Sequence, residues 1–541
     1  MITSATSRRL KITAVIVLAA VALALPFCLI PYGFWPVDEP YQILLSKDCT
    51  VNPVAFLSSF IIGAWGNVFG DDLATMRAFA AILSTATVAI AGFVLYSHTR
   101  RPLLSIAIAS VANILLTFNQ SQSYIIGWDV VSNFLIVASL AALFATINTS
   151  GKKAVYWAGA LGCLTAFAVA SRLPNVAVVP VIAVLLLVKR KWKETASFLI
   201  SAIAIAFILI IAIYGDLFNY FASLSDYTSQ QISSEHNAHQ LLNAAIIAFR
   251  RIWPFALAFF CLLAVAVYAE KKNWNVMMWV AFGLIPIAII CQIAWAFNAD
   301  NQMISDIFAI PVAALILLSL MSKYNENRKE KIWFAVALLC FFVFPNIGSN
   351  AFWSKFLSVQ ILPIVLMPFV LKPMPAARRM LLFVGCTFLI YLPFNKYYCA
   401  TWLDEGISQC GYPLSMPKME NIYTSENRFR RISDIYEFTK NDDDVLIVGD
   451  GWQTFAYSSG KYDKRLVQFF GVINGTLLND ENYVTAIREK IAKEHPKRVI
   501  VTDLILCRHS TDTMMNRMLL YSGYIWTDGG SAHVVYEKAV E

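Results

Sequence analysis

The stretch Trp35–Tyr41 places two adjacent carboxylates, Asp38 and Glu39, just after the first apolar segment, framed by Pro36 and Pro40. A carboxylate at a membrane boundary is costly when it faces lipid, so it usually faces a cavity or a partner. Such a group can take a proton from an acceptor hydroxyl during group transfer. We predict Asp38 as this general base, with Glu39 as second choice or as its orienting partner. The alternative is that Asp38 only caps a helix or solvates the loop.

Other charged residues lie at the ends of apolar segments and could complete a site. Asp129 follows Trp128 at the start of an apolar segment, where it could take part in chemistry or cap a helix. Arg77 and Arg172 lie where a cation needs a partner. For Arg172, a lipid phosphate and an internal salt bridge to Asp129 or Glu39 are both open. Lys355 either binds substrate or extends to lipid headgroups.

The composition predicts the elements that must position these groups. Of 541 residues, 58% are hydrophobic and only 14% are charged, far below the quarter typical of soluble domains. The chain is therefore predicted to be a polytopic α-helical membrane protein. A span needs about 20 apolar residues. About thirteen segments qualify: 12–32, 74–97, 102–118, 125–147, 154–172, 174–188, 195–214, 252–269, 275–296, 303–321, 331–345, 354–371 and 379–395.

The connectors between these segments alternate in charge, which predicts topology rather than nucleic-acid binding. Basic connectors are expected in the cytoplasm, so the Asp38 loop and everything after Asn395 should face outward. The first external loop, 33–73, contains Asn52–Gly70, predicted as an interfacial helix anchored by Trp65 and Phe69. The piece 229–251 is predicted to be a similar external amphipathic helix.

Residues 396–541 are polar enough to form a soluble extracytoplasmic α/β domain beside a transmembrane domain of residues 1–395. Helices are expected at Glu426–Lys440 and Glu481–His495. Strands are expected at Val445–Val448, Arg465–Phe469, Arg498–Thr502 and Val534–Tyr536.

Two features bear on bridges and metals. Cys399 and Cys410 lie eleven positions apart in the external region, a spacing that suits a disulfide in an oxidising compartment. His236 and His239 share a helical spacing, but no third and fourth zinc ligand is visible in the sequence. We predict no cofactor; a divalent ion held by Asp38 and Asp129 is the alternative.

Four short blocks occur in order along the chain. They are Asp38-Glu39-Pro40-Tyr41, Trp65–Gly70 with Met76-Arg77, Gly127-Trp128-Asp129, and Phe352-Trp353-Ser354-Lys355 with Leu362-Pro363. In this order and topology the chain resembles the GT-C glycosyltransferases, the group that includes protein O-mannosyltransferases and lipid A aminoarabinose transferases. The resemblance covers most of residues 1–371. It departs at Asn52-Pro53-Val54, where many relatives carry a His or a Pro-Pro-Leu block.

The resemblance implies a polyprenyl-phosphate-linked sugar donor, transferred by an enzyme of the bacterial inner membrane to a lipid, protein or polysaccharide acceptor. The implied catalytic residues are Asp38, Glu39 and Asp129. The implied substrate-binding residues are Tyr41, Arg77, Arg172, Trp353 and Lys355.

Two other functions remain open. A transporter or flippase of lipid-linked glycans should show paired repeats with broken helices, and the sequence has no such symmetry. A glycan polymerase or ligase would use a diphosphate-linked donor and several external arginines, for which Arg77 and Arg172 are the candidates.

Overall fold

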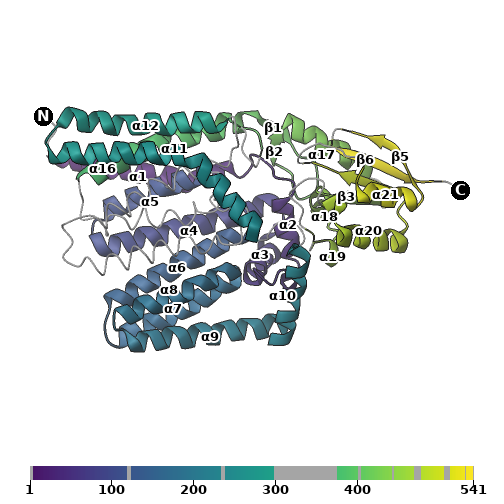
Figure 1. Cartoon of the computed structure of the whole chain (residues 1–541), viewed down its shortest axis with the longest axis horizontal. Coiled ribbons are helices and arrows are strands. Elements are labelled where there is room, and N and C mark those ends of the chain that lie inside the picture. The colour runs from purple at the N-terminus through teal and green to yellow at the C-terminus, as the bar shows by residue number, and fades with distance from the viewer. Residues whose placement is uncertain are drawn as a thin grey trace.

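The computed structural model describes residues 4–118, 124–232, 238–297, 375–399, 404–440, 444–467, 469, 477–504, 512–530 and 532–539. A helical bundle and a smaller α/β domain lie end to end along the long axis of the molecule, with the amino terminus at the far end of the bundle (Figure 1). The mostly helical architecture and the carboxy-terminal α/β region agree with the sequence prediction.

The long helices of the bundle follow the predicted apolar segments closely. They are α1 (Ser4–Leu29), α4 (Leu73–Thr99), α5 (Pro102–Phe118), α6 (Trp128–Asn148), α7 (Lys152–Ser171), α8 (Val178–Val188), α9 (Trp192–Tyr214), α11 (Ala238–Lys271), α12 (Asn275–Phe297) and α16 (Pro375–Tyr398). Among the described residues, seven helices are long and apolar enough to cross a membrane. The predicted segments 303–321, 331–345 and 354–371, with Trp353 and Lys355, lie outside the described residues.

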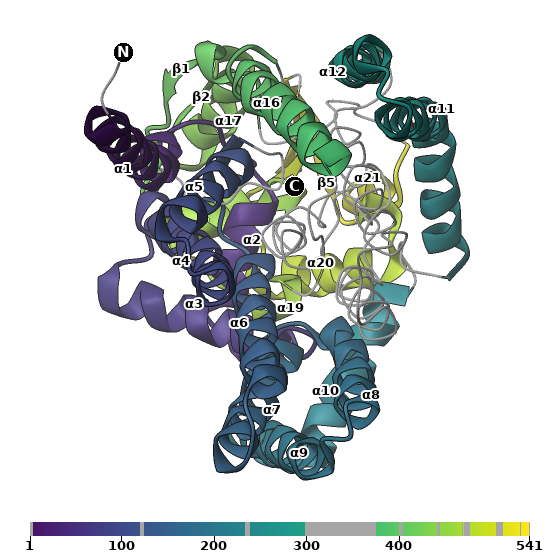
Figure 2. The same ribbon diagram turned by 90° about the vertical axis from the view of Figure 1, so that its left-hand side faces the viewer.

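The bundle helices pack in sequence order. Helix α4 contacts α5 and α6, α7 lies between α6 and α9, and α11 lies beside α12. Viewed along the bundle, α11 and α12 stand apart from the α6–α7–α9 group (Figure 2). Large apolar side chains such as Ile203 and Val276 point away from the protein, 69% and 79% exposed. Outward apolar faces of this extent are typical of lipid-facing helices.

Three short helices lie where the bundle meets the α/β domain: α2 (Asp38–Leu45), α3 (Phe56–Phe69) and α10 (Leu217–Ile232). Helix α3 confirms the helix predicted within Asn52–Gly70. Its Trp65 ring stacks on Phe79 of α4 with centroids 4.8 Å apart. The helix predicted at 229–251 is not a separate element, because residues 229–232 end α10 and residues 238–251 form the start of α11, which continues into the apolar segment; residues 233–237 lie outside the described residues.

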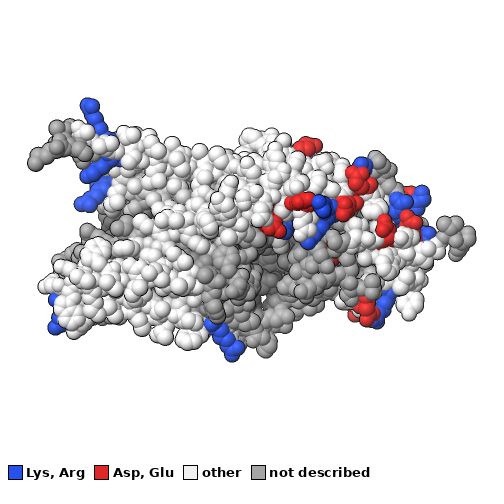
Figure 3. Space-filling view, turned by 90° about the horizontal axis from the view of Figure 1, so that it is seen from above, with Lys and Arg blue, Asp and Glu red and all other residues white. Residues whose placement is uncertain are grey.

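The two ends of the bundle differ in charge. Helix α4 begins beside the α/β domain, where the Leu73 amide bonds the Lys418 carbonyl oxygen at 2.8 Å, and ends at exposed Arg100. Helix α7 runs the other way, from exposed Lys152 toward the loop of residues 33–73. Lys and Arg gather at the far end of the bundle, both signs of charge occur on the α/β domain, and the surface drawn between them is mostly uncharged apart from blue atoms at its lower edge (Figure 3).

The α/β domain is built on a four-stranded sheet of order β3-β4-β6-β5, with β3 and β4 parallel and the other pairs antiparallel. The strands are β3 (Val445–Gly449), β4 (Arg498–Thr502), β5 (Tyr524–Gly529) and β6 (His533–Lys538). The helices are α17 (Glu426–Thr439), α18 (Trp452–Ser459), α19 (Lys464–Val467), α20 (Glu481–Glu494) and α21 (Met514–Tyr521). A hairpin of β1 (Cys410–Pro413) and β2 (Tyr423–Ser425) joins this domain to the bundle.

Three of the four predicted strands and both predicted helices are confirmed. The strand predicted at Arg465–Phe469 is wrong, because most of it forms the single turn α19. Asp463 explains the turn, since its carboxylate accepts the amides of Arg465 and Leu466 at 3.0 and 3.2 Å. An Asp side chain that accepts amides two and three residues ahead favours a helical turn over a strand.

Candidate functional site

Glu39 and Arg77 form a buried ion pair, and neither side chain is exposed to solvent. Arg77 Nε donates to Glu39 Oε1 at 2.8 Å, and Nη2 donates to Oε2 at 2.6 Å. The guanidinium also donates to the carbonyl oxygens of Ile30 at 2.6 Å and Gly33 at 2.7 Å. Because both carboxylate oxygens are engaged inside the protein, the structure does not support Glu39 as a base or Arg77 as a substrate ligand. The ion pair instead connects α4 to α2, and the bonds to Ile30 and Gly33 connect α4 to the loop before α2.

Asp38 has a different environment. It is the first residue of α2, and the seven residues after it in that helix are all buried, whereas Asp38 is half-buried. The N-cap position is Val37, which makes no side-chain capping bond, and Asp38 is the first residue inside the helix. A carboxylate in the first turn is favoured by the helix dipole. The two carboxylates thus differ: Glu39 is buried and paired with Arg77, whereas Asp38 is partly accessible to solvent.

Tyr41 lies behind Asp38 rather than on the surface. It is 1% exposed, and its ring meets the ring of Trp128 edge-on, with centroids 6.5 Å apart. Its hydroxyl is hydrogen-bonded to the hydroxyl of Tyr227 on α10. Burial, followed by Tyr227 and by the nearby Asp38 charge, raises the pKa of Tyr41 well above its usual value. Burial raises the pKa of Tyr227 to about 12. Both hydroxyls are therefore protonated near neutral pH.

Asp129 and Arg172 form a second ion pair near the loop. The Arg172 Nη1 to Asp129 Oδ1 distance is 2.9 Å, with side chains 12% and 30% exposed. Asp129 lies in the first turn of α6, and Arg172 ends α7. Ser58 of α3 holds these two ends together, because its hydroxyl donates to the carbonyl oxygens of Trp128 and Ser171 at 3.3 and 2.9 Å. Of the two roles open for Arg172, the internal salt bridge to Asp129 is the one formed.

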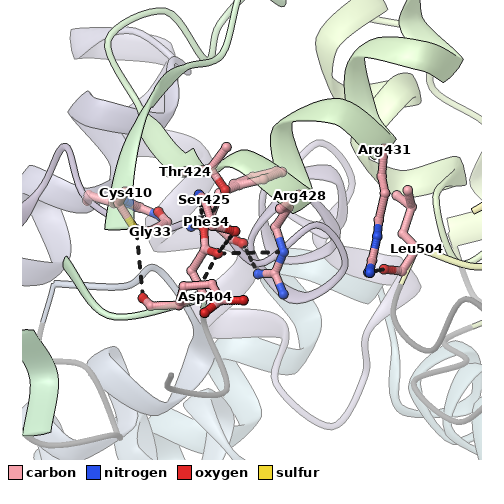
Figure 4. A network of polar contacts seen from close by, with 11 residues as sticks. Gly33, Phe34, Asp404, Cys410, Thr424, Ser425, Arg428, Arg431 and Leu504 are labelled. Carbon is pink, nitrogen blue, oxygen red and sulfur yellow. Dashed lines mark hydrogen bonds and ion pairs between the residues drawn. The ribbon is translucent and has the colours of Figure 1, made fainter. Parts of the chain in front are cut away.

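Residues of the α/β domain form hydrogen bonds to the backbone just before Asp38 (Figure 4). The Phe34 amide donates to buried Asp404 at 3.2 Å, and Arg428 of α17 donates to the Phe34 carbonyl oxygen. Asp404 also accepts from the Ser425 hydroxyl at 2.7 Å and from the Thr424 hydroxyl. Further along the loop, the Thr454 hydroxyl of α18 donates to the Pro36 carbonyl oxygen. The domain therefore fixes the segment that carries Asp38.

A more exposed contact lies at the other end of the loop. Asp71 pairs with Lys47 and, at 3.0 Å, with Lys418 of the α/β region. The Tyr457 hydroxyl donates to the Asp71 carbonyl oxygen at 2.7 Å. Burial works to raise the pKa of the Asp71 carboxyl, but hydrogen bonds from Lys47 and Lys418 outweigh it and hold the pKa below its usual value. Sequence analysis missed the contacts with Lys418 and Tyr457, because more than 300 positions separate these residues from Asp71.

The predicted disulfide between Cys399 and Cys410 is not formed, and both are free cysteines in the structure. The Cys410 thiol lies 3.6 Å from the Glu405 carbonyl oxygen, to which it donates. Burial, followed by the Asp404 charge, raises the pKa of this thiol to about 12. Such a thiol stays protonated at neutral pH and is a poor partner for oxidation.

Metal binding remains a matter of prediction. Over the described ranges, no three His, Cys, Asp or Glu side chains gather as a metal site requires. His236 lies outside the described residues, so the zinc alternative at His236 and His239 is not tested.

No protein-family model and no curated protein matches the chain. Among solved structures, it is similar to ArnT from Cupriavidus metallidurans in the apo state, with 13% sequence identity over 97% of each chain and a TM-score of 0.43. A second structure, ArnT from the same organism bound to undecaprenyl phosphate, is 12% identical over 99% of this chain and 98% of that chain, with a TM-score of 0.38. TM-scores below 0.5 at such identities are too low to assign a fold family or a function.

Proposed function

We propose that the chain is an integral-membrane glycosyltransferase that moves a sugar from a polyprenyl-phosphate carrier to an acceptor hydroxyl, with Asp38 as the general base. The observation that carries the proposal is the division of the acidic pair. Glu39 is closed off by Arg77, while Asp38 is half-buried at the start of α2. The order of the sequence blocks that resemble the GT-C glycosyltransferases agrees with this assignment.

In the proposed reaction, the Asp38 carboxylate takes the proton of the acceptor hydroxyl as its oxygen bonds to the anomeric carbon of the sugar. The bond between that carbon and the phosphate oxygen breaks, and its electron pair leaves with the carrier phosphate. The products are the glycosylated acceptor, a polyprenyl phosphate and a proton that Asp38 passes to water. Tyr41 is protonated and buried, and it packs α2 against Trp128.

The proposed location is the bacterial inner membrane, with the Asp38 loop and the α/β domain on the extracytoplasmic side. Exposed basic residues such as Arg100 and Lys152 lie at the opposite end of the bundle, and basic connectors favour the cytoplasm. A lipid, a protein or a polysaccharide is the proposed acceptor class, and the proposed reaction uses no cofactor.

The ion pairs weigh against a polymerase or ligase with a diphosphate-linked donor. That function relied on Arg77 and Arg172 as external cations. Arg77 is enclosed with Glu39, and Arg172 is paired with Asp129.

The test uses the full-length protein in lipid nanodiscs with a panel of undecaprenyl-phosphate pentoses and hexoses and envelope acceptors, and measures released undecaprenyl phosphate by mass spectrometry. Asp38→Asn keeps the shape of the side chain but is a far weaker base, so turnover should fall by about 10²–10⁴-fold with donor binding kept. Asp216→Asn, at an exposed aspartate beside α10, is the matched control and should transfer as the parent does.

Two results would contradict the proposal at different levels. If the parent protein consumes no donor in the panel, the proposed transferase function is refuted. If the parent is active and the Asp38→Asn variant is equally active, the proposal that Asp38 is the general base is refuted.

A further inference from the structure

Lys396, in the last turn of α16, is a buried cation that pairs with no anion among the described residues. Its side chain belongs to a residue that is 3% exposed. Within the described part of the chain, its Nζ has no hydrogen-bond partner. A lysine near a helix end normally extends its ammonium group to water or lipid headgroups. Lys396 instead points into the protein.

Tyr124 is the group that Lys396 meets. The ammonium lies over the Tyr124 ring, 5.1 Å from its centroid. Tyr124 is 0% exposed, and its hydroxyl also lacks a hydrogen-bond partner among the described residues. A cation over an aromatic ring is attracted to it, but the ring satisfies none of the ammonium's N–H donors. The two side chains together offer three N–H groups and one O–H group to an acceptor.

The carboxylates of the neighbouring network already have cations or donors. Glu39 is bound by Arg77 through two hydrogen bonds. Asp404 lies close enough to interact with Arg428 and accepts several hydrogen bonds. The interior next to the Asp38 loop therefore carries an excess positive charge at Lys396. A buried charge left without a partner costs several kcal/mol, so an anion from outside the described part of the chain is expected to complete the site.

The depth of Lys396 indicates where that anion comes from. The same turns of α16 expose Phe394, Tyr397 and Tyr398, whose rings contact one another with centroids 5.0 and 4.8 Å apart. Exposed aromatic side chains at the end of a membrane helix mark the lipid–water interface. The phosphate of a membrane lipid or lipid carrier lies at this same depth.

The site is close to the Asp38 loop. Tyr124 belongs to a small apolar cluster against which Trp35 packs, three residues before Asp38. An anion between Lys396 and Tyr124 would thus lie beside the loop that carries the base.

We propose that Lys396 and Tyr124 bind the phosphate of a membrane-borne phosphate monoester or diester, a role that the sequence patterns assigned to other cations. The inference rests on the proposed function, in which this phosphate is that of the sugar carrier. When the sugar leaves, the phosphate gains negative charge, and the fixed ammonium group stabilises that charge.

The test measures binding by thermal unfolding and native mass spectrometry of the full-length, ligand-free protein. Four probes separate the sources of the anion: undecaprenyl phosphate, undecaprenol, inorganic phosphate and phosphatidylglycerol. We expect undecaprenyl phosphate to bind and undecaprenol to bind far more weakly. A Lys396-dependent shift with inorganic phosphate or phosphatidylglycerol instead would assign the site to that anion and overturn the carrier role.

The variants test the residues. Lys396→Met keeps the length of the side chain without its charge. It should weaken undecaprenyl phosphate binding by about 10- to 150-fold, the range expected for a lost charge-assisted hydrogen bond. It should also unfold at or above the parent's temperature, because it removes an uncompensated charge. Tyr124→Phe should weaken binding by a smaller factor, and Lys396→Arg should restore part of it.

Lys418→Met is the matched control, because Lys418 also lies over a tyrosine ring, 5.5 Å from the Tyr457 centroid, but already has Asp71 as its anion. It should lose stability and keep ligand binding. The proposal is overturned if Lys396→Met binds undecaprenyl phosphate as the parent does, or if it is destabilised without ligand as a paired lysine would be. A parent that binds none of the four probes overturns both the site and the proposed function.

Discussion

The buried pair of Glu39 and Arg77 gives the sharpest test of how the acidic pair is divided. Glu39→Gln removes the negative charge but keeps the side-chain volume. The guanidinium of Arg77 then lies in a fully buried site with no counter-charge, facing an amide that offers its own donors. If Glu39 has a structural role, as its geometry indicates, this variant should be less stable than the parent but should keep its transfer rate when folded.

The expected size follows from the contacts. Removing one partner of a buried ion pair costs about 3–5 kcal/mol. Arg77→Met should cost at least as much, because it strands the Glu39 carboxylate and also the carbonyl oxygens of Ile30 and Gly33, each worth about 1–3 kcal/mol when left unsatisfied. The double variant leaves the two carbonyl groups but no unpaired charge. It should therefore be more stable than Arg77→Met alone by about 3–5 kcal/mol, the cost of the unpaired carboxylate.

The assay is unfolding of the four proteins in one detergent, followed by tryptophan fluorescence, with undecaprenyl phosphate release measured on the folded fraction. The parent should be the most stable of the four, and the double variant should be more stable than Arg77→Met. The opposite pattern would refute the reasoning: a Glu39→Gln protein that unfolds with the parent but transfers 10²–10⁴-fold more slowly identifies Glu39 as the base.

Two further predictions concern the other ion pairs. Because the folded-state pKa of Asp71 is depressed, its stabilisation is present above about pH 4 and is lost as the pH falls through the depressed value. Asp71→Asn should thus unfold at a lower temperature than the parent at pH 7, and this difference in unfolding temperature should shrink as the pH is lowered from 5 to 3. A difference that stays constant with pH would contradict the pairing with Lys47 and Lys418. For the second pair, Asp129→Asn and Arg172→Gln should each lower stability by about 1 kcal/mol and leave undecaprenyl phosphate binding unchanged, since the pair is partly exposed and closed on itself. If Arg172→Gln bound undecaprenyl phosphate more weakly and Asp129→Asn bound it more tightly, Arg172 would instead be a ligand of the carrier phosphate.

Sequence reasoning succeeded where the signal is local. The bundle helices could be predicted because each needs a long apolar run ended by charged residues, as α4 is by Arg100. Strand β3 could be predicted from an unbroken run of branched apolar residues. The failure at Arg465–Phe469 was local too, because the capping effect of Asp463 outweighed the apolar residues after it.

The site itself depends on contacts that no local pattern reveals. Asp404 bonds the Phe34 amide across 370 positions, and Thr454 reaches Pro36 across 418. Arg77 was noticed because it is a cation near a helix end, but its partner could not be chosen from composition. Lys396 was assigned only to the tail after the last segment, since burial and the lack of a partner are properties of the packed protein.

One part of the division between Asp38 and Glu39 follows from helix geometry alone. Adjacent residues in a helix point about 100° apart, so the two carboxylates cannot share one face of α2. Because the helix is packed on nearly all sides, one carboxylate must be buried and needs a cation, and Arg77 supplies it through two hydrogen bonds. The position at the start of the helix leaves Asp38 where packing is least complete. In this acidic pair the buried arginine meets the second carboxylate, Glu39, which is therefore the structural anchor. The preceding Asp38 is left as the residue for which we propose the chemical role.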